Sequence, residues 1–326
     1  MQKIIIDTDP GIDDALAILL ALAAKDELEV IALTTVNGNV GIDKVTKNAL
    51  KILEIAGKNV IPVYKGNAKP LMRKSGHCEE YHGDDGLGNL GFGDCCRGDC
   101  QKEYAVDFLV RKVKAETGEI TLVAIGPLTN VAEAVQRDSE FAQSVKELII
   151  MGGAEYEGNM SPHAEFNFWT DPEAAKIVFS AGFKKVTMVG LEATSYAFLS
   201  PALRELLYLI NTPVSRFIYE ITRVYADGNW NMKRELGCRL CDVLTIVYLL
   251  NRDVVKTVDA FVDIETQGLC DGASVVYRTK RYPDKKKNCE IAVKADAKGF
   301  FEIFFGYLFP EYLNIVKELL NGKEEV

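Results

Sequence analysis

The sequence has no run of apolar residues close to the roughly 20 that a membrane-spanning helix requires, and it has no excess of positive charge. Its 47 acidic residues outnumber its 38 lysines and arginines, which gives a formal net charge of −9. Because such a chain repels phosphate backbones and anionic lipid surfaces, we expect no nucleic-acid partner and no membrane partner. The opening residues, MQKIIIDTDPG, also lack the apolar segment of a signal peptide, so we expect a cytoplasmic protein.

One local run of positive charge, KRYPDKKK at residues 280–287, departs from this acidic balance. It contains a proline and an aspartate and lies between two strand-like segments, as a turn does. We interpret the run as a solvated turn between strands.

Eight cysteines are present, but a large core-forming chain without an export signal predicts reduced thiols rather than a disulfide framework. Cys238 and Cys241 form a C-x-x-C pair. A structural zinc site would need a second pair, and the nearest candidates, Cys95, Cys96 and Cys100, are irregularly spaced. The spacing is therefore weak support for zinc, and weaker still for a redox dithiol.

Short apolar runs alternate with segments of helical periodicity, which is typical of a parallel sheet covered by helices. We therefore predict a single α/β domain over residues 1–326, with an open, mostly parallel, Rossmann-like sheet and a small antiparallel extension near the C-terminus. The predicted strands are 3–7, 29–35, 60–64, 121–125, 146–151, 185–189, 258–265, 274–278 and 290–293. The predicted helices are 12–24, 43–56, 105–116, 128–136, 172–181, 201–210 and 213–225, and the long intervening segment 65–103 has the length of a functional or mobile loop.

Four aspartates fall within eight residues near the N-terminus, in the segment DTDPGIDD. Asp7 and Asp9 follow a buried strand, at the end of the sheet where ligands of α/β proteins gather. Helix N-termini favour acidic residues, which is sufficient to explain the second pair, Asp13 and Asp14, but not the first. A divalent cation explains all four, and calcium accepts six to eight oxygen ligands in a flexible geometry.

The segment DTDPGIDDA resembles the N-terminal signature of the nucleoside hydrolase family, the inosine/uridine-preferring nucleoside N-ribohydrolases. The resemblance continues in order along nearly the whole chain, which makes it specific. It implies a calcium-dependent glycosidase of purine and pyrimidine metabolism and nucleotide salvage, which hydrolyses the N-glycosidic bond of ribonucleosides to ribose and free base. The other matching segments are TTVNGN (34–39), HGDDGLG (82–88), AIGPLTN (124–130), MGGAEYEGN (151–159), AEFNFWTDPEAA (164–175) and the region around residue 242.

The resemblance also implies a ligand set. Calcium would be bound by Asp9, Asp14, Asp242 and the main-chain oxygen of Ile125, with Asp7 supporting these ligands from behind. The sugar hydroxyls would be held by five residues, namely Asp13, Asn39, Asn159, Glu165 and Asn167. A homodimer or homotetramer is implied by the habit of the family.

Hydrolysis of an N-glycosidic bond passes through a sugar with cationic character, which carboxylates stabilise. In this family calcium is implied to orient a water and the 2′- and 3′-hydroxyls. Asp9 would then accept the proton of the attacking water as the general base. Glu165 and Asn167 are two residues apart, so in an extended segment both would face the sugar while Phe166 would face the packing.

The sequence departs from well-known family members at the residue that protonates the leaving base. Those members have a histidine directly before the C-terminal aspartate ligand, and this chain has Cys241 before Asp242. A thiol can donate a proton, but a carboxylate neighbourhood should not lower its pKa, so a packing role is the alternative for Cys241.

Three other residues are candidates for contact with the base. His82 lies in a matching loop segment and could be a base contact or an acid, unless it is simply an exposed loop histidine. Tyr225 and Trp230 follow an amphipathic helix and could stack on the base or hydrogen-bond to it, although aromatic residues there are more often core. The base preference, tolerance of deoxyribose, the leaving-group acid and the physiological substrate stay open.

Two other functions compete with the hydrolase. A phosphohydrolase of the haloacid-dehalogenase type also has D-x-D after its first strand, but that pattern leaves the second aspartate pair unexplained. A catalytically impaired protein that binds ribose or nucleosides would keep the metal site and lose turnover with the missing histidine, but the intact Asp9 speaks against it.

Overall fold

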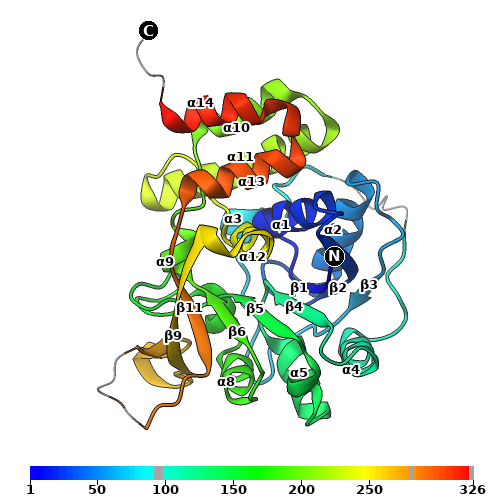
Figure 1. Ribbon diagram of the computed structural model, residues 1–326, viewed down its shortest axis with the longest axis vertical. Helices are drawn as coiled ribbons and strands as arrows, with labels where there is room; N and C mark the ends of the chain where they lie inside the picture. The colour runs from blue at the N-terminus through cyan, green and yellow to red at the C-terminus, as the bar shows by residue number, and fades with distance from the viewer. Residues whose placement is uncertain (92–97, 279–281, 283, 323–326) are drawn as a thin grey trace.

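A nine-stranded sheet forms the centre of the described part of the chain (Figure 1). The computed structural model describes residues 1–91, 98–278, 282 and 284–322. The strand order is β10-β9-β11-β6-β5-β4-β1-β2-β3, and every pairing from β11 to β3 is parallel. The strands are β1 (Gln2–Thr8), β2 (Leu28–Thr35), β3 (Val63–Lys65), β4 (Ile120–Ala124), β5 (Glu147–Met151), β6 (Val186–Val189), β9 (Val255–Ile264), β10 (Ser274–Tyr277) and β11 (Cys289–Ala295). The predicted α/β fold is confirmed.

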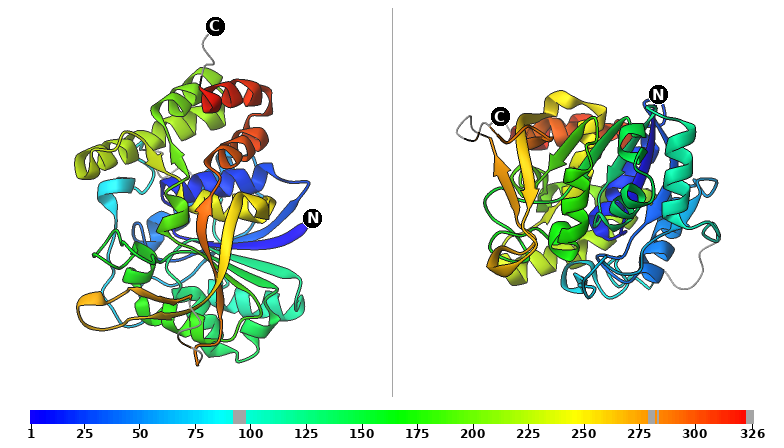
Figure 2. Two further views of the ribbon diagram at one scale, coloured as in Figure 1. Left: turned by 60° about the vertical axis from the view of Figure 1, so that its left-hand side comes forward. Right: turned by 90° about the horizontal axis from the view of Figure 1, so that it is seen from below.

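The predicted antiparallel extension lies at one edge of this sheet. β9 pairs antiparallel with both β10 and β11, and Figure 2 shows β9 and β11 running side by side at the sheet edge. A separate two-stranded ladder joins β7 (Phe198–Leu199) to β8 (Cys238–Arg239). That short ladder was not predicted, because a two-residue strand carries no period that a sequence pattern can show.

Helices cover both faces of the sheet. Strand β1 shows why, since Ile4 and Ile6 belong to one buried cluster and Ile5 to another on the opposite face. A strand that is apolar on both sides must be covered on both sides. The helices on the first face are α1 (Ile12–Ala23), α2 (Ile42–Ile55), α12 (Cys241–Leu250) and α13 (Ala297–Leu308), and those on the second are α4 (Ala105–Ala115), α5 (Thr129–Arg137), α6 (Phe141–Ser144) and α8 (Pro172–Ser180).

The remaining helices stand at the end of the sheet that carries the carboxyl termini of the strands, or extend the first face. Helix α11 continues to Lys233, well past the predicted end at residue 225, because it packs against α3 and anchors the next loop through Asn229, which donates to the carbonyl of Gly237 at 2.8 Å. These helices are α3 (Glu79–His82), α7 (Phe166–Thr170), α9 (Leu191–Thr194), α10 (Pro201–Ile210), α11 (Pro213–Lys233) and α14 (Leu313–Asn321).

Two local predictions need correction or restriction. The third strand begins at Val63 and not at residue 60, because Val60 is 91% exposed and Pro62 has no N–H for a ladder. The basic run connects β10 to β11 as predicted, although residues 280, 281 and 283 lie outside the described part. Within it Lys287 pairs with Asp259 of β9, so the run is partly attached to the sheet. Among the described helices we find none that could span a lipid bilayer.

Candidate active site

A cavity of about 550 Å³ opens at the carboxyl ends of the central parallel strands. Its floor is formed by the loops that follow β2, β4 and β5 and by the N-termini of α1 and α12. This is the edge of an open α/β sheet where ligands are expected. The predicted residues that line the cavity are Asp13, Asn39, His82, Ile125, Asn159, Glu165, Asn167, Tyr225, Cys241 and Asp242.

Asp7, Asp9 and Asp14 are not among the residues that line the cavity, and they are almost completely buried. Asp7 accepts hydrogen bonds from Thr34 Oγ1 (2.5 Å) and Asn130 Nδ2 (2.8 Å), which tie the ends of β1 and β2 to α5. Asp9 Oδ2 accepts the backbone N–H of Asn39 at 2.7 Å, whereas Asp9 Oδ1 has no hydrogen-bond partner among the described residues. A buried carboxylate oxygen without a partner is costly, so Asp9 Oδ1 points to a ligand.

Two glycines permit the close approach of the chain to Asp9. A Cβ at position 38 would stand 1.9 Å from Asp9 Oδ2, and one at position 126 would stand 2.5 Å from Asp9 Oδ1. No side chain could be accommodated at either position without moving this carboxylate. The glycines in TTVNGN and AIGPLTN thus leave the space that the Asp9 carboxylate occupies.

The other three aspartates form one cluster. Asp13, Asp14 and Asp242 each offer a carboxylate oxygen, and these oxygens lie within 4.8 Å of one another. Asp13 and Asp14 lie in the first turn of α1, and Asp242 lies in the first turn of α12. Both helix N-termini therefore direct partial positive charge at the cluster. Asp14 is fixed further by Thr8 Oγ1 (2.6 Å) and by the backbone N–H of Gly11 (3.0 Å).

Burial and mutual repulsion raise the pKa values of these carboxyls. Desolvation raises the pKa of Asp13 to about 8, with a further contribution from Asp14, and raises the pKa of Asp7 to about 7. The pKa values of Asp9 and Asp242 are raised well above the usual range, first by desolvation and then by neighbouring carboxylates. Without a cation, the site would therefore retain protons that a solvated aspartate loses.

The arrangement suits a hard divalent cation with oxygen ligands. The clustered carboxylates, the orphaned Asp9 Oδ1 and the nearby carbonyl of Ile125 are all oxygen donors, as calcium prefers. In the described residues this is the one group of three or more histidine, cysteine or acidic ligands close enough for a metal. The C-x-x-C pair forms no such group there, Cys95 and Cys96 of the zinc alternative lie outside the described residues, and the six described cysteines are free thiols.

The segment with Glu165 and Asn167 departs from the predicted extended geometry. Glu165 caps the short helix α7 and accepts the backbone N–H groups of Asn167 (2.9 Å) and Phe168 (3.3 Å), as well as that of Gly153 (2.8 Å). Phe166 lines the cavity instead of facing the packing, because a helical turn replaces the alternation of a strand. Burial raises the pKa of Glu165 to about 7, against the lowering effect of its backbone donors.

The predicted sugar contacts are held rigidly from behind. Asn167 Nδ2 donates to the carbonyls of Ile125 (3.1 Å) and Met151 (3.0 Å), which connects α7 to the ends of β4 and β5. Asn159 Oδ1 accepts the N–H of Phe166 at 2.9 Å. Asn39 Nδ2 donates to Asp14 Oδ2 and to the carbonyl of Asp9, both at 3.1 Å. The polar groups of the floor are thus fixed before any substrate arrives.

His82 and Cys241 stand on the walls of the cavity. His82 is buried, and its Nδ1 accepts the backbone N–H of Ile12 at 3.0 Å, so it is not the exposed loop histidine of the alternative. This bond leaves the hydrogen on Nε2, and burial lowers the pKa of His82 to about 4. Burial raises the pKa of the Cys241 thiol to about 12, with Asp13 adding to the effect. Both groups are neutral near pH 7.

Two aromatic residues of α11, Tyr225 and Trp230, were predicted to contact the base, and the structure places them differently. Tyr225 lines the cavity, with its ring centroid 5.6 Å from that of His82. Trp230 is not among the lining residues. It is 43% exposed and stacks beneath Arg234, because it lies on a different face of the helix. Tyr225, Asn229 and Lys233, spaced by four residues, form the cavity face of α11. The structure therefore gives no support to the predicted contact of Trp230 with the base.

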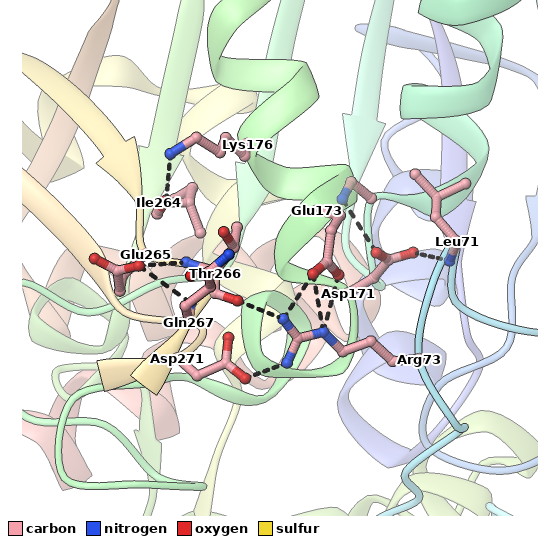
Figure 3. A network of polar contacts seen from close by, with 11 residues as sticks. Leu71, Arg73, Asp171, Glu173, Lys176, Ile264, Glu265, Thr266, Gln267 and Asp271 are labelled. Carbon is pink, nitrogen blue, oxygen red and sulfur yellow. Dashed lines mark hydrogen bonds and ion pairs between the residues drawn. The ribbon is translucent and has the colours of Figure 1, made fainter. Parts of the chain in front are cut away.

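The segment that leads into α3, the helix that carries His82, is anchored at Arg73. Arg73 donates to both oxygens of Glu173, at 2.9 and 3.1 Å from Nε, and to the carbonyl of Thr266 at 2.8 Å (Figure 3). It also pairs with Asp271, and Asp171 accepts the N–H of Leu71 at 2.8 Å nearby. This network ties the segment before α3 to α8 and to the end of β9.

Sequence reasoning missed several polar residues at the outer part of the cavity. Two of them, Tyr156 and Glu157, lie inside the matching segment MGGAEYEGN, and the period of four from Tyr225 along an extended α11 could have indicated Asn229 and Lys233. The other four have no motif around them. The full set is Tyr156, Glu157, Glu192, Ser195, Asn229, Lys233, Glu235 and Arg239.

Comparison with known proteins agrees with this geometry. A sequence model of the family described as inosine-uridine preferring nucleoside hydrolase matches residues 4–302. Uridine nucleosidase 1 of Arabidopsis thaliana is 41% identical over 281 residues, which cover 84% of this chain and 82% of the relative. The inosine-uridine preferring nucleoside hydrolase of Leishmania major is 38% identical over 304 residues, which cover 92% and 95% of the two chains.

A solved structure extends the likeness to three dimensions. The plant nucleoside hydrolase PpNRh1 superposes with a TM-score of 0.88 and 34% identity, covering 94% of this chain and 98% of the other. Family match, identity and fold all agree with the ordered motifs and the aspartate site described above. The chain belongs to the inosine-uridine preferring nucleoside hydrolase family, and it is a nucleoside N-ribohydrolase that splits ribonucleosides into ribose and free base.

Proposed function

We propose that this chain carries out the reaction with calcium bound by Asp9, Asp14, Asp242 and the main-chain oxygen of Ile125. The observation that supports this most strongly is the convergence of Asp13, Asp14 and Asp242 within 4.8 Å. Asp9 is not in that group, but desolvation and then its neighbours Asp14 and Asp13 raise its pKa, and its buried Oδ1 lacks a partner among the described residues. When bound, calcium would supply positive charge that holds the attacking water and the sugar diol in one frame. Asp13, which belongs to the cluster and also lines the cavity, faces the sugar.

In the proposed reaction, Asp9 acts as the general base. Its Oδ1 accepts a proton from the attacking water as the oxygen of that water bonds to C1′. Asn39 holds Oδ2 through its backbone N–H, so the carboxylate presents its other oxygen in one orientation. The surrounding buried carboxylates stabilise the positive charge that the sugar gains as the bond to the base lengthens.

The sugar is held by Asp13, Asn39, Asn159, Glu165 and Asn167. Four of these side chains are fixed by hydrogen bonds to backbone groups or to neighbouring floor residues, which supports a preformed binding site. A hydroxyl of the sugar can still be bound, because carboxylate and amide oxygens accept more than one hydrogen bond.

At the base end, His82 and Tyr225 contact the base, and Cys241 is a packing residue rather than the acid. His82 can offer only its Nε2–H, since Nδ1 is occupied by Ile12. A thiol whose pKa is raised to about 12 is a poor proton donor at neutral pH.

A reducing-sugar assay over a panel of purine and pyrimidine nucleosides tests this function. The panel is run with and without a calcium chelator, on the wild-type protein and on Asp9→Ala. Release of ribose that stops with the chelator and returns with calcium supports the proposal. Ribose release that is unaffected by thorough chelation would refute the calcium dependence, and tight nucleoside binding without any ribose release would favour the impaired binding protein.

The compartment, the assembly and the base preference are also proposals. We propose a cytoplasmic homodimer or homotetramer, for which the six free thiols and the family membership are the supporting observations. The related proteins carry names that refer to uridine alone or to inosine and uridine together, so the nucleoside panel must include both.

A further inference from the structure

Cleavage of the glycosidic bond leaves an electron pair on the nitrogen of the departing base. That charge must meet a proton donor, a cation or a strong hydrogen-bond donor before the base can leave readily. The lining of the cavity is otherwise electrostatically unfavourable for an anion, since six of its eight charged residues are acidic. The two cations among the described lining residues, Lys233 and Arg239, are therefore the groups to consider.

The backbone of Arg239 is fixed on both sides. Arg239 pairs with Phe198 in the β7–β8 ladder, and the next residue, Leu240, donates its N–H to the carbonyl of Ala197 at 2.8 Å. The loop before it is held by Asn229, which donates to Gly237. Arg239 therefore stands in a defined place on the cavity wall, two residues before Cys241, which also lines the cavity.

The guanidinium of Arg239 is oriented and keeps one donor unused. Nη2 donates to both oxygens of Glu235, at 3.0 and 3.1 Å, which fixes the plane of the group. Nε is buried and has almost no accessible surface, so the group of Arg239 that can reach an acceptor in the cavity is Nη1, which makes no hydrogen bond with the described residues. A guanidinium stays charged at any working pH, and Nη1 can therefore donate to a ligand there.

Lys233 is the weaker candidate of the two. It is exposed at the last turn of α11, and its ammonium is a strongly hydrated point charge on a flexible stem. The planar guanidinium of Arg239 is instead preorganised by Glu235 and by the β7–β8 ladder.

We propose that Arg239 is the leaving-group catalyst of this enzyme, donating a hydrogen bond to the nitrogen or carbonyl oxygen of the departing base. The inference rests on the proposed function. The water oxygen bonds to C1′, its proton passes to Asp9, and the C1′–N bond breaks with its electron pair on the base. Arg239 stabilises the base anion, which then takes a proton from solvent while Asp9 returns its own. Arg239 itself neither gains nor loses a proton.

The test compares two leaving groups in the same enzyme sample. Inosine and uridine need help at the base, whereas p-nitrophenyl β-D-ribofuranoside releases a phenolate that leaves readily without it. For Arg239→Gln we expect kcat on both nucleosides to fall about 100-fold, and kcat on the p-nitrophenyl riboside to change less than about threefold. The ratio of the two rates does not depend on the fraction of folded protein, so partial unfolding cannot imitate the result.

Two further variants complete the test. Arg239→Lys keeps the charge without the planar fork and should lose about tenfold on the nucleosides. Lys233→Met, the matched removal of the other cation, should leave the ratio within about twofold of the wild type. Equal losses on both kinds of substrate for Arg239→Gln would overturn the proposal, and so would unchanged nucleoside turnover. Failure of the wild-type enzyme on every riboside would instead refute the function on which the proposal rests.

Discussion

The two ends of the cavity differ in how their side chains are supported. At the sugar end, the aspartates and asparagines other than the exposed loop residue Asn159 lie at strand ends and in first helical turns, and they are at most 7% exposed. Hydrogen bonds to neighbouring residues at the strand ends hold them. At the base end, α3, α11 and β8 contribute side chains from the long segments between strands, and one of these side chains, Lys233, is exposed. The part of the reaction common to all ribosides is thus built at the strand ends, whereas the part that meets the base is carried by the segments between strands.

The largest expected effect lies at the sugar end. Asp9→Ala removes the proposed base and a proposed metal ligand, so we expect kcat/KM for any hydrolysed nucleoside to fall at least about 1,000-fold, or about 4 kcal/mol. Steady-state ribose release measures the loss. Asp43→Ala, at the exposed start of α2, removes a carboxylate of the same kind away from the cavity and should leave kcat/KM within about twofold. A loss of kcat/KM below tenfold for Asp9→Ala would mean that the sugar end of the cavity does not hold the catalytic base.

Calcium should stabilise the protein more as pH rises. The raised pKa values of Asp13 (about 8) and Asp7 (about 7) mean that, between about pH 4 and 8, the folded protein without calcium binds more protons than the unfolded chain. Its stability therefore falls as pH rises through this window. Calcium competes with those protons, so its stabilisation grows from pH 5 to pH 8.5, reaching about 2.7 kcal/mol at a concentration of 100 Kd. Thermal unfolding with and without calcium measures this. A stabilisation by calcium that is larger at pH 5 than at pH 8.5 would contradict the assignment of these aspartates to the calcium site.

Breaking the Arg73 anchor should affect the base end alone. Arg73→Gln leaves Glu173 and Asp271 without their shared cation and frees the segment before α3. We expect a loss of about 2 kcal/mol in unfolding free energy and a severalfold rise in KM with little change in kcat, as measured by denaturant unfolding and steady-state kinetics. The more exposed Arg111, paired with Glu103, is the matched control, and Arg111→Gln should cost less than about 1 kcal/mol. A collapse of kcat with unchanged KM in Arg73→Gln would show that the anchor also supports the catalytic floor.

Cys241→Ala should have a smaller effect, although Cys241 lies next to the proposed ligand Asp242. A neutral, buried thiol contributes packing rather than a proton, so kcat should fall less than tenfold, about 1.4 kcal/mol. The pH–rate profile should keep its shape in the alkaline limb. A loss of 100-fold or more, or a shifted limb, would show that the thiol is the acid after all.

The smallest effect is expected at Trp230. Because its ring lies outside the cavity, Trp230→Ala should change KM and kcat for nucleosides by less than about twofold. Tyr225→Ala, on the cavity face of the same helix, should raise KM by about tenfold. Equal effects of the two substitutions would mean that the helix face has been assigned wrongly.

The sequence predicts the sugar end far better than the base end for a physical reason. The ends of β1, β2 and β4 and the first turn of α1 are short segments in which residue spacing fixes side-chain direction, so DTDPGIDDA carries its geometry with it. Asp242 could be added only through family resemblance. The positions of Arg239 and Glu235 depend on a two-residue ladder and on the length of α11. Trp230 lies beyond the predicted helix end at residue 225, so the sequence did not show which face of α11 it occupies. The turn at Glu165 was missed because a side-chain cap on two backbone donors leaves no periodic pattern.

The cluster of Asp13, Asp14 and Asp242 joins positions more than two hundred residues apart in the chain. During synthesis, at roughly 5–20 residues per second, the first two aspartates leave the ribosome at least about ten seconds before the third. Until α12 docks against α1, the N-terminal carboxylates lack the partner that completes the cluster. Binding of a metal at this cluster would therefore come late in the maturation of the nascent chain, and it would stabilise the packing of α12 against α1.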